Sequence, residues 1–363
     1  MKIGIVGLPN AGKSSLFNAL TRAGAQAANY PFTTLEPNVA VVGVPDDRLD
    51  RVAETVGAAP VIHEVIQFHD IAGLVRGAHQ GEGLGNQFLA NIRETVAILH
   101  VVRFHDDSSV VHPEGRVDPL ADVETVETEL LYADLEQAER RLERVTRQAR
   151  SLEKELVAEE AWLRRVVDAL REGRAVRTVP EPADAPGAAV RLSALTSKPV
   201  LYVANVGEGE ALEPPPELLE HARARGARAT AVSARLEAEL AELDDAEAAA
   251  MRDELGAGES GLATVIREAF ALLDLISFFT AGQDAEARAR AIRRGTRARQ
   301  AAGAVHTDME RGFVAAEVTP WDALVEAGGY AAARERALTR VEGRDYVVQD
   351  GEVVTFRFTP SAG

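Results

Sequence analysis

The stretch Gly7-Leu8-Pro9-Asn10-Ala11-Gly12-Lys13-Ser14 constrains the fold of this chain more than any other. It follows a short apolar run, and Leu16, Phe17 and Leu20 come after it at helical spacing. The loop is therefore predicted to connect a buried strand to a helix. A G-x-x-x-x-G-K-S loop in that setting is a P-loop, whose backbone N–H groups hold the phosphates of a nucleotide.

The side chains of this loop are predicted to have separate tasks. Lys13 would reach the β- and γ-phosphates, and the hydroxyl of Ser14 would bind Mg²⁺. Asn10 either stabilises the turn or, as in related P-loops, helps to hold a K⁺ ion against the phosphates, and the sequence leaves both interpretations open. The predicted nucleotide-binding residues of the loop are Asn10, Ala11, Gly12, Lys13, Ser14 and Ser15.

Composition excludes several classes of protein. The 363 residues suggest two or three domains, and the absence of cysteine excludes disulfides, thiolate zinc sites and a cysteine nucleophile. A formal net charge of −17 argues against indiscriminate nucleic-acid binding, so any RNA contact is expected to be local. Because no apolar run approaches the roughly 20 residues that span a bilayer and no leader precedes the first strand, we expect a cytoplasmic protein without membrane contact. We also expect a monomer.

A second phosphate-sensing motif, Asp70-Ile71-Ala72-Gly73, follows the predicted strand Val65 to Phe68. At the end of a strand, an aspartate would hold Mg²⁺ through water and the N–H of Gly73 would meet the γ-phosphate, although the motif alone also occurs as a plain turn. The proline-rich loop between the two motifs carries Thr34, predicted to act in Mg²⁺ binding and catalysis.

The catalytic water lacks an obvious partner in this sequence. Many nucleotide switches place a glutamine directly after D-x-x-G, whereas this chain has Leu74, which cannot orient water. His112, in a polar loop after the predicted strand Ile98 to Val102, is one candidate for that role, and a solvent-facing loop histidine is the alternative.

The base-binding side is expected to follow two later strands, Pro199 to Ala204 and Ala227 to Val232. P-loop proteins that bind GTP read guanine with N-K-x-D, but this chain has Asn205-Val206-Gly207-Glu208, which lacks the lysine and places the carboxylate on a longer side chain. ATP is therefore preferred over GTP, with Val206 packing on adenine and Asn205 meeting its edge. The predicted base-side residues are Asn205, Val206, Glu208, Ser233 and Ala234.

A long helical segment separates these two groups of strands. Leu120 to Glu172 contains neither Gly nor Pro and has apolar residues at heptad spacing, which predicts one long helix or an antiparallel hairpin. Glu159 interrupts the repeat, and the interleaved arginines and glutamates favour an ion-paired, solvated face. After a proline-rich linker the chain returns to strands.

The last 85 or so residues are predicted to form a separate small mixed α/β domain. Its expected strands are Ala287 to Ile292, Gly312 to Val318, Tyr346 to Val348 and Val353 to Phe358, with Asp350-Gly351 as the turn of a hairpin. Between Arg288 and Arg299 there are six arginines and no acidic residue, so this segment is the preferred RNA contact over the arginines of the long helix.

These motifs together resemble the Obg-like ATPases of the YchF family. The resemblance is carried by the P-loop, Asn29 to Thr34 with Glu36-Pro37-Asn38, Asp70 to Leu74, Gly81 to Asn86 and Asp345 to Gly351. It implies an α/β fold with a P-loop Rossmann-like nucleotide domain (1–119 and 196–276), an inserted helical arm (120–195) and a C-terminal TGS domain of β-grasp type (277–363).

The resemblance also implies a function. It points to a slow, Mg²⁺-dependent ATPase switch, with K⁺ as a second candidate cofactor, that associates with the ribosome and modulates translation or the stress response. A ribosome-associated GTPase and a protein-binding regulator controlled by nucleotide occupancy are the alternatives. Two departures stand out, since the arm lacks a Gly-rich turn and His69 replaces an apolar residue before the switch aspartate.

Overall fold

The computed structural model describes residues 1–26, 38–71, 84–105, 115, 118–149, 153–210, 212–255, 260–282 and 285–359. The chain forms two compact units, the first from residues 1–23, 35–40 and 67–265 and the second from 24–34, 41–66 and 266–363. Residues 41–66, which we expected in the nucleotide domain, therefore group with the C-terminal part of the chain. Among the described helices, none has the length and apolar character needed to cross a membrane.

The first unit is built on a six-stranded sheet in the order β2-β4-β1-β5-β6-β7. Strand β1 pairs in parallel with β4 and β5, and β6 pairs in parallel with β5 and β7. Every residue of β5 and β6 is buried, as expected for strands covered on both faces. The strands are β1 (Lys2–Val6), β2 (Val39–Gly43), β4 (Val65–Asp70), β5 (Ala97–Arg103), β6 (Val200–Asn205) and β7 (Arg228–Val232). The last four agree with their predicted ranges to within two residues at either end.

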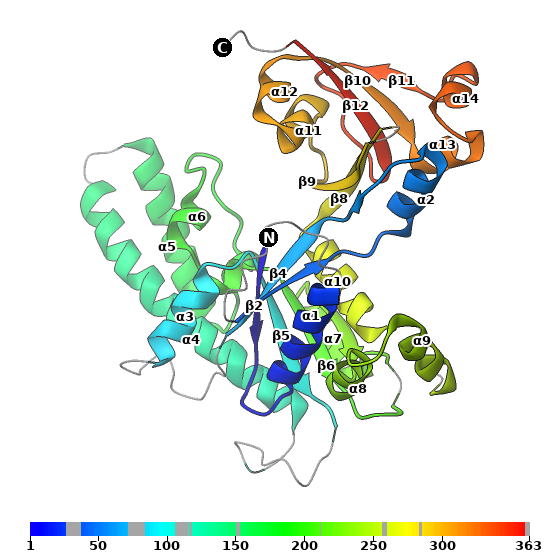
Figure 1. The fold of residues 1–363 in the computed structure, drawn as a ribbon. Coiled ribbons are helices and arrows are strands. Elements are labelled where there is room, and N and C mark those ends of the chain that lie inside the picture. The colour runs from blue at the N-terminus through cyan, green and yellow to red at the C-terminus, as the bar shows by residue number, and fades with distance from the viewer. Residues whose placement is uncertain are drawn as a thin grey trace. The chain divides into compact units, whose positions relative to one another are not determined.

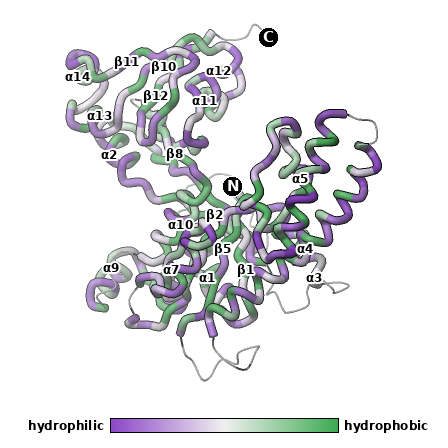
Figure 2. The backbone as a smooth tube through the Cα atoms, turned by 180° about the vertical axis from the view of Figure 1, so that it is seen from behind, coloured by the Kyte–Doolittle hydropathy of each residue, from purple (hydrophilic) through white to green (hydrophobic). Residues whose placement is uncertain are grey.

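Helices cover this sheet. An apolar cluster on one face joins the strands to α3 (Leu84–Arg93), α4 (Pro119–Gln148) and α7 (Pro216–Ala224). The strands of this core are largely green in the hydropathy view of Figure 2, whereas α9 is mostly purple. The other helices of the unit outside the arm are α1 (Lys13–Gln26), α8 (Ala234–Leu240) and α9 (Asp245–Glu254), and α10 (Gly261–Leu272) begins in this unit and ends in the second.

The helical arm is a hairpin, which decides between the two interpretations left open by the sequence. Helix α4 begins at the N-cap Asp118, whose side chain accepts a hydrogen bond from the N–H of Ala121, and α5 (Lys154–Arg171) lies beside it (Figure 1). Their heptad positions pack around Trp162 together with the short helices η3 (Val176–Thr178) and α6 (Ala188–Leu192). The following short helix, η4 (Leu195–Ser197), contacts α4 and places Leu195 in the apolar cluster of the sheet.

Glu159, the residue that breaks the heptad pattern, is buried within this packing. Its carboxylate lies 2.7 Å from a guanidinium nitrogen of Arg141 and 2.7 Å from one of Arg191, so two arginines compensate one buried charge. The predicted ion-paired face of the arm is confirmed by four exposed pairs, namely Arg140–Glu136, Arg147–Glu143, Arg164–Glu160 and Arg171–Glu139.

The second unit has a mixed six-stranded sheet in the order β11-β10-β12-β8-β9-β3. The pairs β12–β8 and β3–β9 are parallel, and the other pairs are antiparallel. The strands are β3 (Val61–Ile62), β8 (Leu275–Ala281), β9 (Ala287–Arg293), β10 (Phe313–Pro320), β11 (Arg340–Glu342) and β12 (Glu352–Phe358). The helices are α2 (Asp47–Val56), α11 (Ala298–Val305), α12 (Thr307–Arg311), α13 (Trp321–Ala327) and α14 (Tyr330–Glu335).

The predicted terminal hairpin is wrong. Tyr346 to Val348 makes only an isolated bridge, between Val347 and Arg297, and β12 pairs with β10 and β8. Asp350 explains the difference, because its carboxylate accepts a 2.9 Å hydrogen bond from the N–H of Ser277 and pairs with Arg48. The turn therefore ties the chain to β8, a strand that the sequence analysis did not predict.

Candidate nucleotide-binding site

The predicted site residues gather where the parallel strands of the first unit end. The P-loop follows β1, Asp70 ends β4, Asn205 ends β6 and Ser233 follows β7. Because these strands run in the same direction, their carboxyl ends share one edge of the sheet. Ligands of open α/β sheets bind at this edge.

The P-loop has a conformation that its glycines make accessible. Gly7, Asn10 and Gly12 have positive φ angles of 152°, 63° and 98°. A Cβ atom on Gly7 would lie 2.4 Å from the carbonyl oxygen of Val101, and one on Gly12 would lie 2.1 Å from the side-chain nitrogen of Asn205. Both positions therefore require glycine for close approach as well as for φ.

The side chain of Lys13 is buried and folds back onto the P-loop. Its Nζ donates a 2.7 Å hydrogen bond to the carbonyl oxygen of Leu8. Burial lowers the pKa of Lys13 to about 8, an effect that the charge of Asp70 opposes. Burial likewise raises the pKa of the Asp70 carboxyl, and the charge of Lys13 opposes that rise. The two groups thus form an electrostatic pair at the loop.

Ser14 and Asp70 offer the oxygen atoms that a hard cation requires. Ser14 is exposed in the first turn of α1, as is Ser15, and Asp70 is partly buried at the end of the neighbouring strand. Within the described ranges, no group of three or more His, Cys, Asp or Glu side chains is arranged to hold a metal. A site with two protein oxygens fits Mg²⁺, which keeps several waters and binds substrate phosphates.

Asn205 connects three strand ends, a role that the sequence analysis missed. Its side-chain nitrogen donates to the carbonyl oxygen of Ala11 at 3.1 Å and lies 3.4 Å from Nε2 of His105, and its oxygen accepts from the N–H of Ala234 at 3.0 Å. The amide is buried, so it positions the P-loop rather than presenting a free edge to a base. No local signal in the sequence predicts a contact across 194 positions.

The other base-side residues differ from the expectation. Val206 is 5% exposed and packs in the apolar cluster of the sheet, so its side chain is not placed to cover adenine, which corrects our assignment. Glu208 forms an ion pair with Arg235, at 2.7 Å between Oε1 and Nε. Ser233 has a buried hydroxyl for which no hydrogen-bond partner is found among the described residues. That hydroxyl lies directly after β7, beside Ala234, and is available to a ligand.

Three predicted residues, Thr34, Gly73 and His112, lie outside the described residues, as does Leu74. Their predicted roles in catalysis and Mg²⁺ binding stay predictions.

Several arginines of the segment predicted to contact RNA, residues 288–299, already form ion pairs within the protein. Arg288, Arg294 and Arg297 form ion pairs with carboxylates outside the segment, those of Glu286, Asp274 and Asp345. The lack of acidic residues between 288 and 299 therefore does not leave these charges unpaired, and it no longer distinguishes this segment from the arm.

Comparisons with known proteins agree with this architecture. A family model described as "50S ribosome-binding GTPase" matches residues 2–146, and a C-terminal YchF-GTPase model, described as a protein of unknown function, matches residues 275–359. A Bacillus subtilis (strain 168) protein named "Ribosome-binding ATPase YchF" is 45% identical over 98% of each chain, and its Haemophilus ducreyi counterpart is 47% identical over 98% of this chain and 99% of its own.

A solved structure extends the match to the fold. The Schizosaccharomyces pombe YchF GTPase superposes with a TM-score of 0.84 and 33% identity, over 98% of this chain and 97% of that one. The match spans the P-loop domain and the C-terminal domain alike. Since the relatives match end to end, the chain belongs to the YchF family of P-loop proteins.

Proposed function

We propose that this protein is a slow ATPase switch that associates with the ribosome. The observation that carries the proposal is the arrangement of Lys13, Ser14 and Asp70 at the carboxyl ends of adjacent parallel strands, which is suited to a nucleotide triphosphate with Mg²⁺. The printed names of its relatives, "Ribosome-binding ATPase YchF", support the choice of ATP and ribosome.

ATP rather than GTP is the proposed substrate because the groups that read guanine are missing. There is no lysine after Asn205, and the carboxylate of Glu208 pairs with Arg235 instead of facing a base unopposed. We expect ATP to displace a labelled nucleotide at lower concentration than GTP. A tenfold or greater preference for GTP would favour the alternative GTPase. Glu208→Asp tests whether the length of this carboxylate side chain contributes to the preference.

Cations complete the proposed site. Mg²⁺ would be held by Ser14 and Asp70, with Thr34 as a further proposed ligand, and supplies charge neutralisation for phosphoryl transfer. Asn10, exposed with a positive φ, is the proposed K⁺ contact. If K⁺ takes part, replacing it with Na⁺ slows phosphate release, whereas equal rates in the two salts leave Asn10 a turn residue.

The parts of the chain are proposed to have separate roles. Residues 1–119 and 196–276 would bind and hydrolyse ATP, and the arm (120–195) and the TGS-type domain (277–363) would contact the ribosome. Residues 41–66 belong to the second of these contact regions by their packing. A ribosome partner implies a cytoplasmic location, and we propose a monomer.

Phosphate release tests the enzyme proposal. Lys13→Ala should abolish release from ATP, because the buried ammonium group is the loop's only side-chain cation. Lys2→Ala is the matched control, since Lys2 is an exposed lysine at the start of β1, the strand whose other end leads into the P-loop. Parent protein that releases phosphate no faster than Lys13→Ala would indicate a regulator that acts by occupancy alone.

Co-sedimentation with ribosomes tests the partner. Pelleting is measured with ATP, ADP and no nucleotide, at several salt concentrations, for the parent and for a variant with Arg293, Arg294 and Arg297 changed to Glu. Nucleotide-dependent pelleting that weakens with salt supports the proposal. If the charge-reversed variant no longer pellets, the contact lies in the C-terminal unit. If pelleting is lost only when the arm is trimmed, the contact lies in the arm. No pelleting under any condition contradicts ribosome association.

A further inference from the structure

A cavity of about 280 Å³ lies within the first unit, between α4 and the strands β5 and β6. Its wall is closed by the segment from Gly173 to Thr178 and by the end of α7. Neither Lys13, Asp70 nor Asn205 lines it, so it is separate from the nucleotide site.

The inner wall of the cavity is apolar, with one polar exception. Ile98, Leu130 and Val200 line it, and between them His100 projects from β5. His100 is 3% exposed. Among the described residues, its ring contacts that of Tyr202, at 5.6 Å between centroids, and no hydrogen bond to its nitrogens is found. Burial lowers the pKa of His100 to about 4, so its neutral ring can both donate and accept. A buried polar side chain of this kind is usually hydrogen-bonded.

Of the charged side chains that line the cavity, all but Arg177 form an ion pair with a carboxylate or arginine among the described residues. Glu127 is fully engaged, since it accepts from Tyr202 and lies 3.1 Å from Nε2 of His221 and 2.9 Å from Nε of Arg225. Arg174 likewise pairs with Glu172 at 2.7 Å.

Arg177 differs from these groups. Its guanidinium donates to backbone carbonyls, at 3.1 Å to Thr196 and at 3.5 Å to Lys198 and Arg225, and no carboxylate among the described residues pairs with it. A guanidinium fits a planar anion such as a carboxylate better than the ammonium group of a lysine does, because its N–H donors lie in a planar fork.

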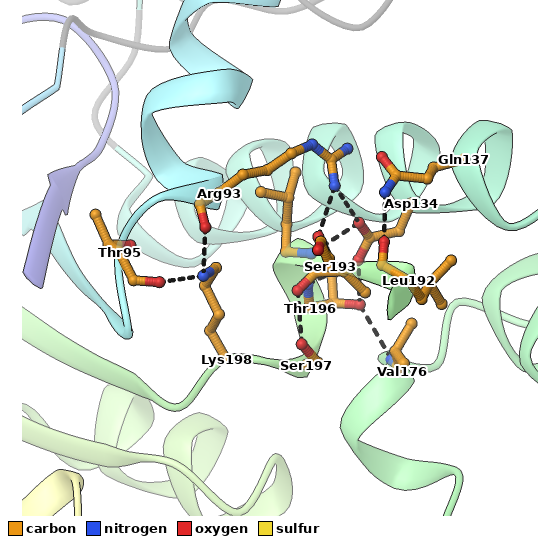
Figure 3. Close-up of polar contacts among 12 residues, drawn as sticks. Arg93, Thr95, Asp134, Gln137, Val176, Leu192, Ser193, Thr196, Ser197 and Lys198 are labelled. Carbon is orange, nitrogen blue, oxygen red and sulfur yellow. Dashed lines mark hydrogen bonds and ion pairs between the residues drawn. The ribbon is translucent and has the colours of Figure 1, made fainter. Parts of the chain in front are cut away.

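The residue before Arg177, Val176, belongs to a network of hydrogen bonds with Thr196 and Asp134 (Figure 3). The carboxylate of Asp134 accepts hydrogen bonds from the N–H of Leu195 and from both the N–H and the hydroxyl of Thr196, at 2.7 to 2.8 Å. The Thr196 hydroxyl in turn accepts from the N–H of Val176, at 3.0 Å. The residue before Arg177 is thus fixed to α4 through two hydrogen bonds, so the cation is held in place before any ligand arrives.

We propose that this cavity binds a small organic anion, an apolar body with one carboxylate, whose charge pairs with Arg177 and whose polar atoms meet His100. The volume sets the size, because a cavity of about 150 Å³ holds benzene and this one is nearly twice as large, so it suits a ligand of about ten to twelve non-hydrogen atoms. The inference does not depend on the proposed ATPase activity, since no nucleotide-site residue takes part.

Isothermal titration calorimetry of the full chain with 3-phenylpropionate tests the proposal. We expect saturable binding of one equivalent with a Kd below about 1 mM, and at least tenfold weaker binding of 3-phenylpropionamide, which has the same shape without the charge. Saturating ADP with Mg²⁺ should leave the affinity unchanged. Absence of saturable binding, equal affinity for the amide, or displacement by ADP would overturn the proposal.

Two variants locate the probe. Arg177→Gln should weaken binding at least tenfold, while Arg171→Gln, on the same part of the chain but paired with Glu139 outside the cavity, should not. Ala175→Phe fills the cavity from its wall and should abolish binding without removing a charge. Circular dichroism establishes that each variant is folded. Unchanged binding in the folded Ala175→Phe protein would place the probe elsewhere and refute the site, even if Arg177→Gln fails to fold.

Discussion

As the pH falls, the first unit should lose stability because His100 resists protonation in the folded state, and this loss begins at a higher pH than the protonation of most carboxylates. The ring is buried between β5 and α4, and its pKa falls from the ordinary 6.5 to about 4. Burial is the main cause, the charges of His221 and Lys13 act in the same direction, and Glu127 opposes them. In the unfolded chain the same ring takes up a proton at its ordinary pKa.

The magnitude follows from linkage. Because the folded pKa is the lower one, the unfolded state binds the proton first as the pH falls, so stability is complete above about pH 6.5 and decreases toward pH 4. Each pKa unit corresponds to about 1.4 kcal/mol, and the full difference is therefore about 3.4 kcal/mol. Between pH 7 and pH 5 the expected loss is about 2 kcal/mol of unfolding free energy.

Urea denaturation at the two pH values measures this loss. The chain has two tryptophans, and Trp162 is buried in the arm of the first unit, so a Trp321→Phe background reports unfolding of that unit alone. In this background the parent should lose about 2 kcal/mol more between pH 7 and pH 5 than His100→Gln, which has no ring to protonate. His306→Gln, an exposed histidine of the second unit, is the matched control. Equal losses in the parent and in His100→Gln would refute the reasoning.

Three further changes have defined outcomes. Glu159→Ala leaves its two arginine partners without their buried carboxylate and should lower the unfolding free energy by about 3–5 kcal/mol in urea titrations, whereas Glu136→Ala on the exposed face should cost less than about 1 kcal/mol. Gly12→Ala places a Cβ 2.1 Å from a side-chain amide at φ 98° and should weaken binding of a fluorescent ATP analogue at least tenfold, unlike Gly226→Ala, which has positive φ but open space. Asp134→Asn should cost about 1–3 kcal/mol in the same urea titrations, because one of three donors then meets an amide N–H, and an unchanged midpoint would contradict that account.

Much of the nucleotide-binding unit could be predicted from the sequence because its signals are local. The buried strands read as continuous apolar runs, and the P-loop combines glycine spacing with a lysine and a serine in one stretch. Such patterns depend on neighbours within a turn or a strand.

The features that were missed depend on distant residues. Glu159 looked like a fault in the heptad repeat because one of its arginine partners comes 32 positions later, after a linker. Asn205 was assigned to the base from its local motif, because its hydrogen-bond partner in the P-loop lies 194 positions earlier and leaves no local signal. Val206 was assigned likewise, although the apolar cluster of the sheet already occupies its side chain. In each case the competing contact exists only once the chain has folded.

The membership of residues 41–66 in the second unit has a consequence during synthesis. Helix α2 and the residues after it contribute Leu49, Val52, Ala53 and Ala58 to an apolar cluster whose remaining buried members come from residue 279 onward. About 200 residues separate Ile66 from Ile266, where the rest of that unit begins. At 5–20 residues per second, a nascent chain would carry the apolar face of α2 without its partners for roughly 10 to 40 seconds. A fragment that begins after residue 265 would, for the same reason, lack part of its own core.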